Sequence, residues 1–502
     1  MSTTRRRFIE AAVAGGTLAG MADLKFLNTL PRVSAEETKK GVVELKPDIE
    51  PLVRLLEETP RERLLEEVAG RIRGGTTYKE VLAALLLAGV RNVQPRPVGF
   101  KFHAVLVVNS AHLASISSPE EHRWLPIFWA LDYFKDSQAQ DAQQGDWTMA
   151  PVDEAAVPDA AKAKNLFIEA MNEWDEAKAD AAAAGLARTG KPAEVYELFS
   201  RFGCRDFRDI GHKAIYVANS WRTLDCIGWQ HAEPVLRSLA YALLEHGEGN
   251  PARDDLDADR PGKENLKRAQ TIRDAWQDGK VDGQATSELL ATFHGASADD
   301  ACQQVVEMLN RGVAPQSIWD AVLVGAGELL ARQPGIVALH AVTSANALYY
   351  AYRANQDDSL RRLLLLQNAA FVPLFRGAMQ GRGKVADVDL RTLQPAPLAE
   401  GDALADIFTA VGSDRTTAAR KTLAFLQNEG DVKAYIDAAR LLVFFKGRNA
   451  HDYKFSSALL EDYAHLSPGW RDRYLASGVF NLRGSAEPDN QLVARTRAAL
   501  ST

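Results

Sequence analysis

Apolar residues recur at helical spacing along most of the chain, and this periodicity limits the possible folds more than any other feature of the sequence. Positions that share one face of a helix are apolar, while the alternation typical of a half-buried strand is almost absent. The clearest apolar faces are Val81, Leu82, Leu85 and Leu86, and then Val322, Leu323, Leu329 and Leu330. The sequence therefore predicts an all-α fold.

Two hydroxyl residues are each followed three positions later by a glutamate, a pattern typical of the capping box that opens a helix. These pairs are Thr77 with Glu80 and Ser118 with Glu121. We expect one helix to begin beside each pair, the second of them at Pro119.

Segments of residues 70–246 recur in the same order within residues 308–482, mostly at an offset of 237 to 240. This recurrence predicts an internally duplicated, repeat-like architecture with two pseudo-symmetric halves. Six of the ten histidines fall into repeat-related pairs. The pairs are His103 with His340, His212 with His451, and His231 with His465.

Breaks in the helical pattern give the domain organisation. Charged or proline-rich stretches interrupt it at 247–262 and at 383–402. We predict a first helical half at 36–246, a charged linker at 247–262 and a second helical half at 263–502. The stretch 383–402 is then a loop inside the second half.

Residues 1–35 place Arg5, Arg6 and Arg7 before a weakly apolar run, which is the layout of a twin-arginine signal peptide. The alternative is a basic disordered tail. The signal predicts an exported, periplasmic protein. The twin-arginine translocase would be a partner during export, and it carries folded proteins that often already hold a cofactor.

Composition excludes several classes of protein. No stretch approaches the roughly 20 apolar residues of a membrane span, so we expect none. Residues 1–35 carry a net charge of +3, and their removal changes the net charge from −7 to −10, which argues against nucleic acid as a partner. Three cysteines without C-x-x-C spacing indicate neither a disulfide framework nor covalent haem attachment.

Four histidines are the candidate site. If the halves pack about a pseudo-twofold axis, His103, His212, His340 and His451 converge at the shared interface. Such a cluster suits a redox metal such as iron or copper, a haem held by histidines such as His103 and His340, or a polar substrate pocket.

The alternative is that these imidazoles are scaffolding, each bonded to a backbone carbonyl near a helix start. For His231 and His465, which each precede a proline by three residues, we expect a role in helix capping.

Three further side chains are candidates for catalysis. Tyr216 and Asn219 share a helix face with His212. Asp132, one turn before Asp136, is a candidate oxygen ligand or general base, and the alternative is a solvated helix end. No complete nucleotide-binding, serine-hydrolase or zincin motif is present.

The segment from His340 to Leu348 resembles the histidine-valine-threonine motif of questin oxidase-like proteins. Residues 211–216 resemble their second histidine motif, and residues 102–113 more distantly resemble their first, which is richer in histidine. The resemblance implies an all-helical oxygenase of the Baeyer–Villiger type acting on aromatic polyketide-like compounds, with His103, His212 and His340 at the matching positions. We carry over only the fold and a general oxidoreductase activity.

The leading interpretation is an exported, oxygenase-like oxidoreductase for a small organic substrate. Its paired histidines would bind a redox metal or haem, or polarise the substrate. The alternative is a non-catalytic helical-repeat binding protein of the periplasm. Imidazoles within ligand distance of one another favour the enzyme, whereas dispersed histidines bonded to backbone carbonyls favour the binding protein.

Overall fold

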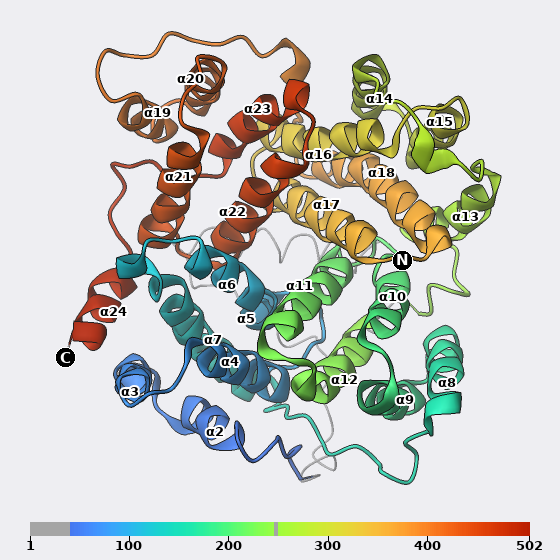
Figure 1. The fold of residues 1–502 in the computed structure, drawn as a ribbon, viewed down its shortest axis with the longest axis vertical. Helices are drawn as coiled ribbons and strands as arrows, with labels where there is room; N and C mark the ends of the chain where they lie inside the picture. Colours follow the sequence, from blue (N-terminus) through green and yellow to red (C-terminus); the bar gives the residue numbers. More distant parts are fainter. Residues whose placement is uncertain (1–40, 245–248, 502) are drawn as a thin grey trace.

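The computed structural model describes residues 41–244 and 249–501, and within these ranges the protein is helical throughout (Figure 1). No strand occurs in the described ranges, where the one recorded β-bridge joins Lys280 and Val313. The all-α prediction is therefore confirmed. Among the described helices, none combines the length and the apolar character that a membrane crossing needs.

Four helices form a closed ring at the centre of the molecule. They are α6 (Val108–Ile116), α11 (His212–Ile227), α17 (Ile336–Ala354) and α22 (Ala450–Asp462). Helix α17 packs against both α11 and α22, and α6 closes the ring by packing against the same two helices (Figure 1). The short helix α5 (His103–Leu106) leads directly into α6. Each quarter of the ring thus comes from a different part of the chain.

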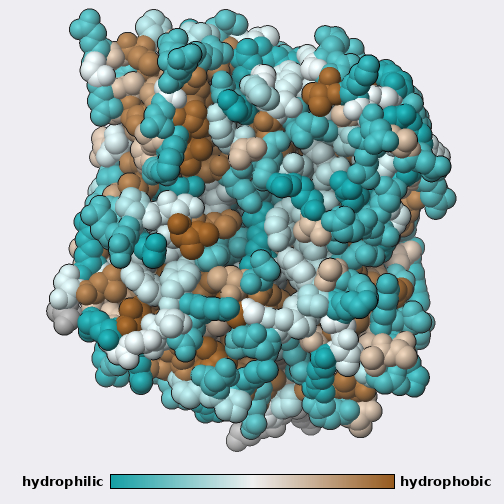
Figure 2. Space-filling model, viewed as in Figure 1, coloured by the Kyte–Doolittle hydropathy of each residue, from teal (hydrophilic) through white to brown (hydrophobic). Residues whose placement is uncertain are grey.

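The remaining helices surround this ring and bury its outer faces. Those of the first half are α2 (Glu50–Glu58), α3 (Arg61–Arg73), α4 (Tyr78–Asn92), α7 (Leu125–Gln144), α8 (Ala160–Glu173), α9 (Glu176–Thr189), α10 (Pro192–Gly203) and α12 (Ala232–Leu243). Those that follow are α13 (Arg260–Arg268), α14 (Gly283–Gly295), α15 (Ala298–Asn310), α16 (Pro315–Arg332), α18 (Asp358–Gln380), α19 (Ala403–Val411), α20 (Arg415–Gln427), α21 (Val432–Lys446), α23 (Pro468–Ser477) and α24 (Gln491–Ser501). Helix α24 returns to pack on α3 and α7 of the first half. Hydrophilic and intermediate residues cover most of the face seen in Figure 2, with apolar residues showing between them.

The two predicted capping boxes have different outcomes. Thr77 caps α4, and the reciprocal bonds between Thr77 and Glu80 are both present, so this prediction is confirmed. The box at Ser118 is wrong, because the Ser118 hydroxyl donates back to the Ala114 carbonyl at 2.7 Å and so closes the preceding helix. Pro119 leads only into a short 3-10 turn, and the helix that carries Asp132 begins six residues later, at Leu125.

The described part of the predicted linker is packed onto the first half. Asp259 and Arg208 form a buried ion pair at 2.6 Å, and helix α13 already begins at Arg260. The loop predicted at 383–402 is present and contains only one 3-10 turn (Leu390–Thr392). The signal peptide predicted at 1–35 lies outside the described residues, and the internal duplication stays a prediction.

His231 and His465 do not cap helices. His231 occupies the position before α12, but its side chain makes no capping bond. His465 ends a 3-10 turn (Tyr463–His465), and its ring nitrogens lie 2.9 and 3.0 Å from a guanidinium nitrogen of Arg353. The capping prediction is therefore wrong for both.

A buried carboxyl at the end of α22 gives the fold a pH dependence. Asp462 accepts hydrogen bonds from Asn346 at 2.8 Å and from Tyr474 at 3.0 Å, and burial raises its pKa to about 8. The folded protein therefore binds this proton more tightly than the unfolded chain does. The unfolding free energy consequently decreases as the pH rises towards 8.

We expect the Asp462→Asn substitution to remove that loss, because the amide mimics the protonated acid. Between pH 5 and 8 the wild type should lose unfolding free energy relative to the variant by about 1.4 kcal/mol per pH unit. Denaturant unfolding at several pH values measures the difference. A constant difference across this range would contradict the assignment.

Candidate metal centre

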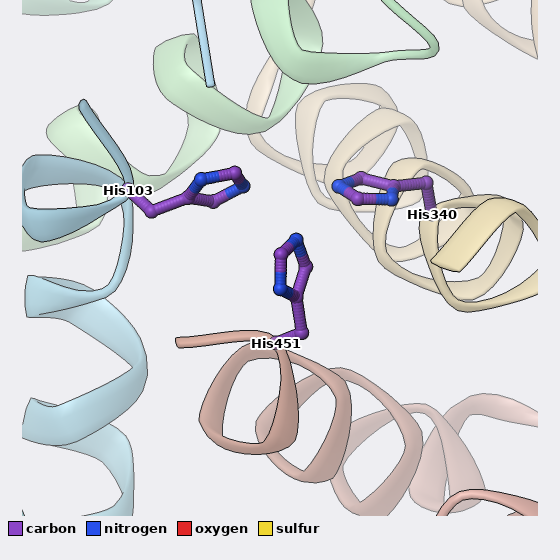
Figure 3. Close-up of side chains that lie close together, drawn as sticks. All are labelled: His103, His340 and His451. Atoms are coloured by element: carbon purple, nitrogen blue, oxygen red, sulfur yellow. The ribbon is translucent and has the colours of Figure 1, made fainter. Parts of the chain in front are cut away.

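Four of the predicted residues, His103, His212, His340 and His451, meet at one end of the central ring. We call them the histidine cluster. Ring centroids lie 4.4 Å apart for His212 and His340, 4.5 Å for His103 and His451, and 5.0 Å for His103 and His212. One ring nitrogen from each of His103, His340 and His451 lies within 4.8 Å of the other two, and Figure 3 shows these three rings pointing toward one another. All four side chains are thus brought to one point.

The cluster forms where four helices begin. His103 and His212 are the first residues of α5 and α11, His451 is the second of α22, and His340 lies in the first turn and a half of α17. A helix that starts at the cluster directs its unpaired N–H groups toward it, which gives the region a positive potential. This potential favours neutral imidazoles and anionic ligands.

Two glycines allow the backbone to approach this closely. Gly99 has a φ of +133°, and a side chain there would meet the His212 ring at 3.3 Å. Gly211, with a φ of +81°, lies where a Cβ atom would be 2.0 Å from the Ser344 hydroxyl oxygen. The start of α11 can therefore rest directly on α17 only because residue 211 lacks a side chain.

The tautomer of three of the rings follows from their hydrogen bonds. The Nδ1 atoms of His103, His212 and His340 lie 2.7 to 2.8 Å from the carbonyl oxygens of Phe100, Asp209 and Ile336. A carbonyl only accepts, so each Nδ1 must carry the proton. In the neutral ring this leaves the Nε2 lone pair free to bind a metal, and backbone bonds of this kind commonly orient metal-ligating histidines.

The separation of two Nε2 atoms matches that of two nitrogen ligands on one metal ion. His103 Nε2 lies 3.1 Å from His212 Nε2, so two lone pairs face each other. A metal with nitrogen ligands at about 2.0 to 2.1 Å places adjacent ligand atoms roughly 2.9 Å apart in octahedral and roughly 3.3 Å apart in tetrahedral geometry. The observed spacing falls between these values. The buried Nε2 atoms of His340 and His451 have no hydrogen-bond partner in the described structure.

Burial keeps the cluster neutral. It lowers the pKa of His212 to about 3, and it lowers the pKa values of His103, His340 and His451 well below their usual range. The second cause for His103, His212 and His451 is the positive charge of Lys454. Neutral imidazoles are the form that coordinates a metal.

Lys454 is a functional candidate that sequence reasoning missed. It lies one turn after His451 on α22 and is 2% exposed, and its Nζ has no hydrogen-bond partner among the described residues. Burial lowers its pKa to about 7. Lys454 follows His451 by three residues, which the sequence shows. The repeat-related position in the first half holds Ile215, so comparison of the two halves did not indicate a functional lysine.

Metal affinity should therefore fall as the pH drops below 7. The four imidazoles are already neutral there, whereas Lys454 gains a charge that repels the cation, so binding must release its proton. We expect the affinity for Co²⁺, followed by visible absorption, to weaken by up to about tenfold per unit below pH 7. The control variant Lys454→Met should show a flat profile over the same range, and a flat profile in the wild type would contradict the prediction.

The cluster forms the inner wall of a cavity of about 1090 Å³. Its outer walls carry the aromatic side chains Phe100, Trp129 and Tyr133. The charged side chains of these walls are Arg61, Lys101, Asp132, Asp136, Arg448, Asp489 and Arg495. A small organic molecule fits a space of this size beside a metal.

Asp132 lines this cavity but is held by an arginine. Arg61 donates to both of its carboxylate oxygens, at 2.6 and 3.0 Å, and also pairs with Asp136 at 3.1 Å. Asp132 is therefore part of the cavity wall, and the solvated helix end proposed as its alternative does not describe a side chain that is 7% exposed.

Tyr216 and Asn219 do not line the cavity. The Tyr216 hydroxyl donates to Ser238 at 2.7 Å, and the Asn219 amide donates to the Leu106 carbonyl at 2.9 Å. Both lie further along α11, where the ring of helices is packed, so the structure gives them a role in joining helices.

A second group of possible ligands, His294, Glu328 and Asp389, contacts other groups of the protein. His294 Nε2 lies 2.6 Å from a Glu328 oxygen, and the other Glu328 oxygen accepts the Leu390 N–H at 2.8 Å. Arg391 holds Asp389 at 2.6 Å. These contacts fasten the loop after α18 to α16, and we assign the group a structural role.

Comparison of the chain with protein-family models, with curated proteins and with solved structures finds no match. The resemblance to questin oxidase-like proteins stays an expectation based on the three histidine segments.

Proposed function

We propose that the protein is an exported oxidoreductase in which the histidine cluster holds a redox metal, iron or copper, beside a cavity for a small organic substrate. The observation that carries this proposal is the 3.1 Å separation of His103 Nε2 and His212 Nε2 while both Nδ1 atoms are bonded to carbonyls. With both rings neutral and protonated at Nδ1, this contact brings together two lone pairs, which a bound cation would stabilise.

The arrangement of the rings favours a mononuclear metal over haem. The His103 and His340 centroids are 6.2 Å apart, which suits two axial ligands, but His212 and His451 lie between 4.4 and 5.2 Å from these rings. Those two imidazoles occupy the space that a macrocycle would fill. Imidazole ligands suit iron, copper, nickel and zinc.

The histidine ligands would leave the charge of a bound metal uncompensated. Four neutral imidazoles add no negative charge, and Asp132, a sequence-predicted carboxylate that lines the cavity, is bound by Arg61. Such a ligand set stabilises the lower oxidation state of a redox metal. A metal held there would supply oxidation chemistry beside the cavity, and the carbonyl-bonded Nδ1 atoms would keep its ligands in place.

The test is the metal content of the mature protein purified after native export, measured by plasma mass spectrometry together with visible absorption. Near-stoichiometric iron or copper supports the proposal. Zinc alone would contradict the redox role, and a colourless, metal-free protein would favour the non-catalytic helical-repeat binding protein.

A further inference from the structure

The carboxylates that line the cavity are all neutralised by neighbouring side chains. Arg61 pairs with both Asp132 and Asp136. Asp489 pairs with Lys446 at 2.6 Å. The cavity wall therefore offers no free negative charge among the described residues.

One cation of the cavity wall differs from the others. Lys101 pairs with Asp141 at 2.6 Å, and Arg495 pairs with Glu66 at 2.8 Å. Arg448 is exposed at the cavity, two residues before α22. Its backbone N–H donates to Asp452, while its guanidinium has no ion-pair or hydrogen-bond partner within the part of the chain that the structure describes. A planar guanidinium in this state is suited to bidentate recognition of a carboxylate.

The inner wall of the cavity also favours an anion. The histidine cluster carries no negative charge, and the helix starts of α11, α17 and α22 add a positive potential there. A metal bound by neutral imidazoles would add a further uncompensated charge. An anionic ligand in the cavity would thus be attracted both by Arg448 and by the helix starts.

Three aromatic side chains give part of the cavity wall an apolar character. Phe100 is 36% exposed and is the one exposed large hydrophobic residue in the described structure that also lines the cavity. Trp129 and Tyr133 are stacked at 5.1 Å between centroids and line it as well. This surface would cover an apolar group several atoms long.

We propose that the cavity binds an organic carboxylate with an apolar body. Arg448 binds the carboxylate group, and Phe100, Trp129 and Tyr133 contact the body. The chemistry that follows binding rests on the proposed function, whereas recognition of the carboxylate does not.

The experiment is calorimetric titration of the purified, natively metallated protein with 1-naphthoate and octanoate, and with 1-naphthalenemethanol as the uncharged analogue. We expect 1-naphthoate to bind at least tenfold more tightly than the alcohol. The Arg448→Gln variant should lose about tenfold in affinity for both carboxylates and retain its affinity for the alcohol. The matched control Arg415→Gln changes an exposed arginine at a helix start outside the cavity and should bind like the wild type.

Equal binding of naphthoate and the alcohol, or unchanged naphthoate binding by Arg448→Gln, would overturn the proposal. Metal content is measured on each variant, so the two proposals fail separately. If a metal-free preparation binds the carboxylate and this binding depends on Arg448, the result supports the present inference. It then counts only against the proposed metal centre.

Discussion

The His340→Ala variant should remain folded and lose its metal. His340 lies between 4.4 and 6.2 Å from the other three rings of the cluster by centroid, and its Nε2 has no hydrogen-bond partner in the described structure. Loss of a ligand should cost at least as much as loss of an outer-shell partner, so we expect metal affinity to fall about 100-fold or more. Competition with a chromophoric chelator measures this change.

The control for this variant is His465→Ala. His465 belongs to a repeat-related pair but contacts Arg353 and Tyr349 away from the cluster. Its replacement should leave metal affinity unchanged, and far-ultraviolet circular dichroism should show near-native helix content in both variants. Full metal retention by His340→Ala would rule out ligation by this residue.

The Lys454→Met variant should be more stable than the wild type when both are free of metal. Burial lowers the Lys454 pKa from its ordinary value to about 7, and its Nζ has no hydrogen bond to lose among the described residues. The unfolded chain binds this proton more tightly, so the lysine lowers the unfolding free energy progressively as the pH falls from about 10 to 7. At pH 7 we expect the substitution to add about 2 to 4 kcal/mol.

Lys213→Met is the matched control. Lys213 is equally buried, but its Nζ lies 3.2 Å from Asp206 and 3.3 Å from Asp209, so its removal leaves buried carboxylates without their cation. We expect a loss of about 3 to 5 kcal/mol for this variant. Chemical denaturation of the chelated proteins compares the two, and destabilisation by Lys454→Met would show that the amine has a partner in the folded state.

The sequence was sufficient for the fold class and for the four histidines. Helical periodicity is local, and the Thr77 capping box depends on bonds between residues three apart. Ser118 follows the same pattern, but it lies one turn after Ala114. Its hydroxyl donates to the Ala114 carbonyl and does not cap a following helix. The Ser118 side chain can bond either to the end of the preceding helix or to the start of a following one. A local sequence pattern does not show which of the two bonds forms.

The side chains around the cluster were harder to predict because their partners are distant in sequence. Spacing placed Tyr216 and Asn219 on the His212 face of α11, but only the first turn of that face reaches the cavity, since each turn advances about 5.4 Å. Asp132 is neutralised by Arg61, which lies 71 residues earlier. Nothing in the local pattern around Asp132 indicates that contact.

The four quarters of the histidine cluster meet only after distant parts of the chain have come together. His103 and His212 alone are 109 residues apart, and closing such loops costs entropy that local helix formation does not recover. A metal held by all four imidazoles would therefore bind the finished core and not its separate halves. Its occupancy would report completed assembly, and mass action would make the same metal stabilise the folded centre of the molecule.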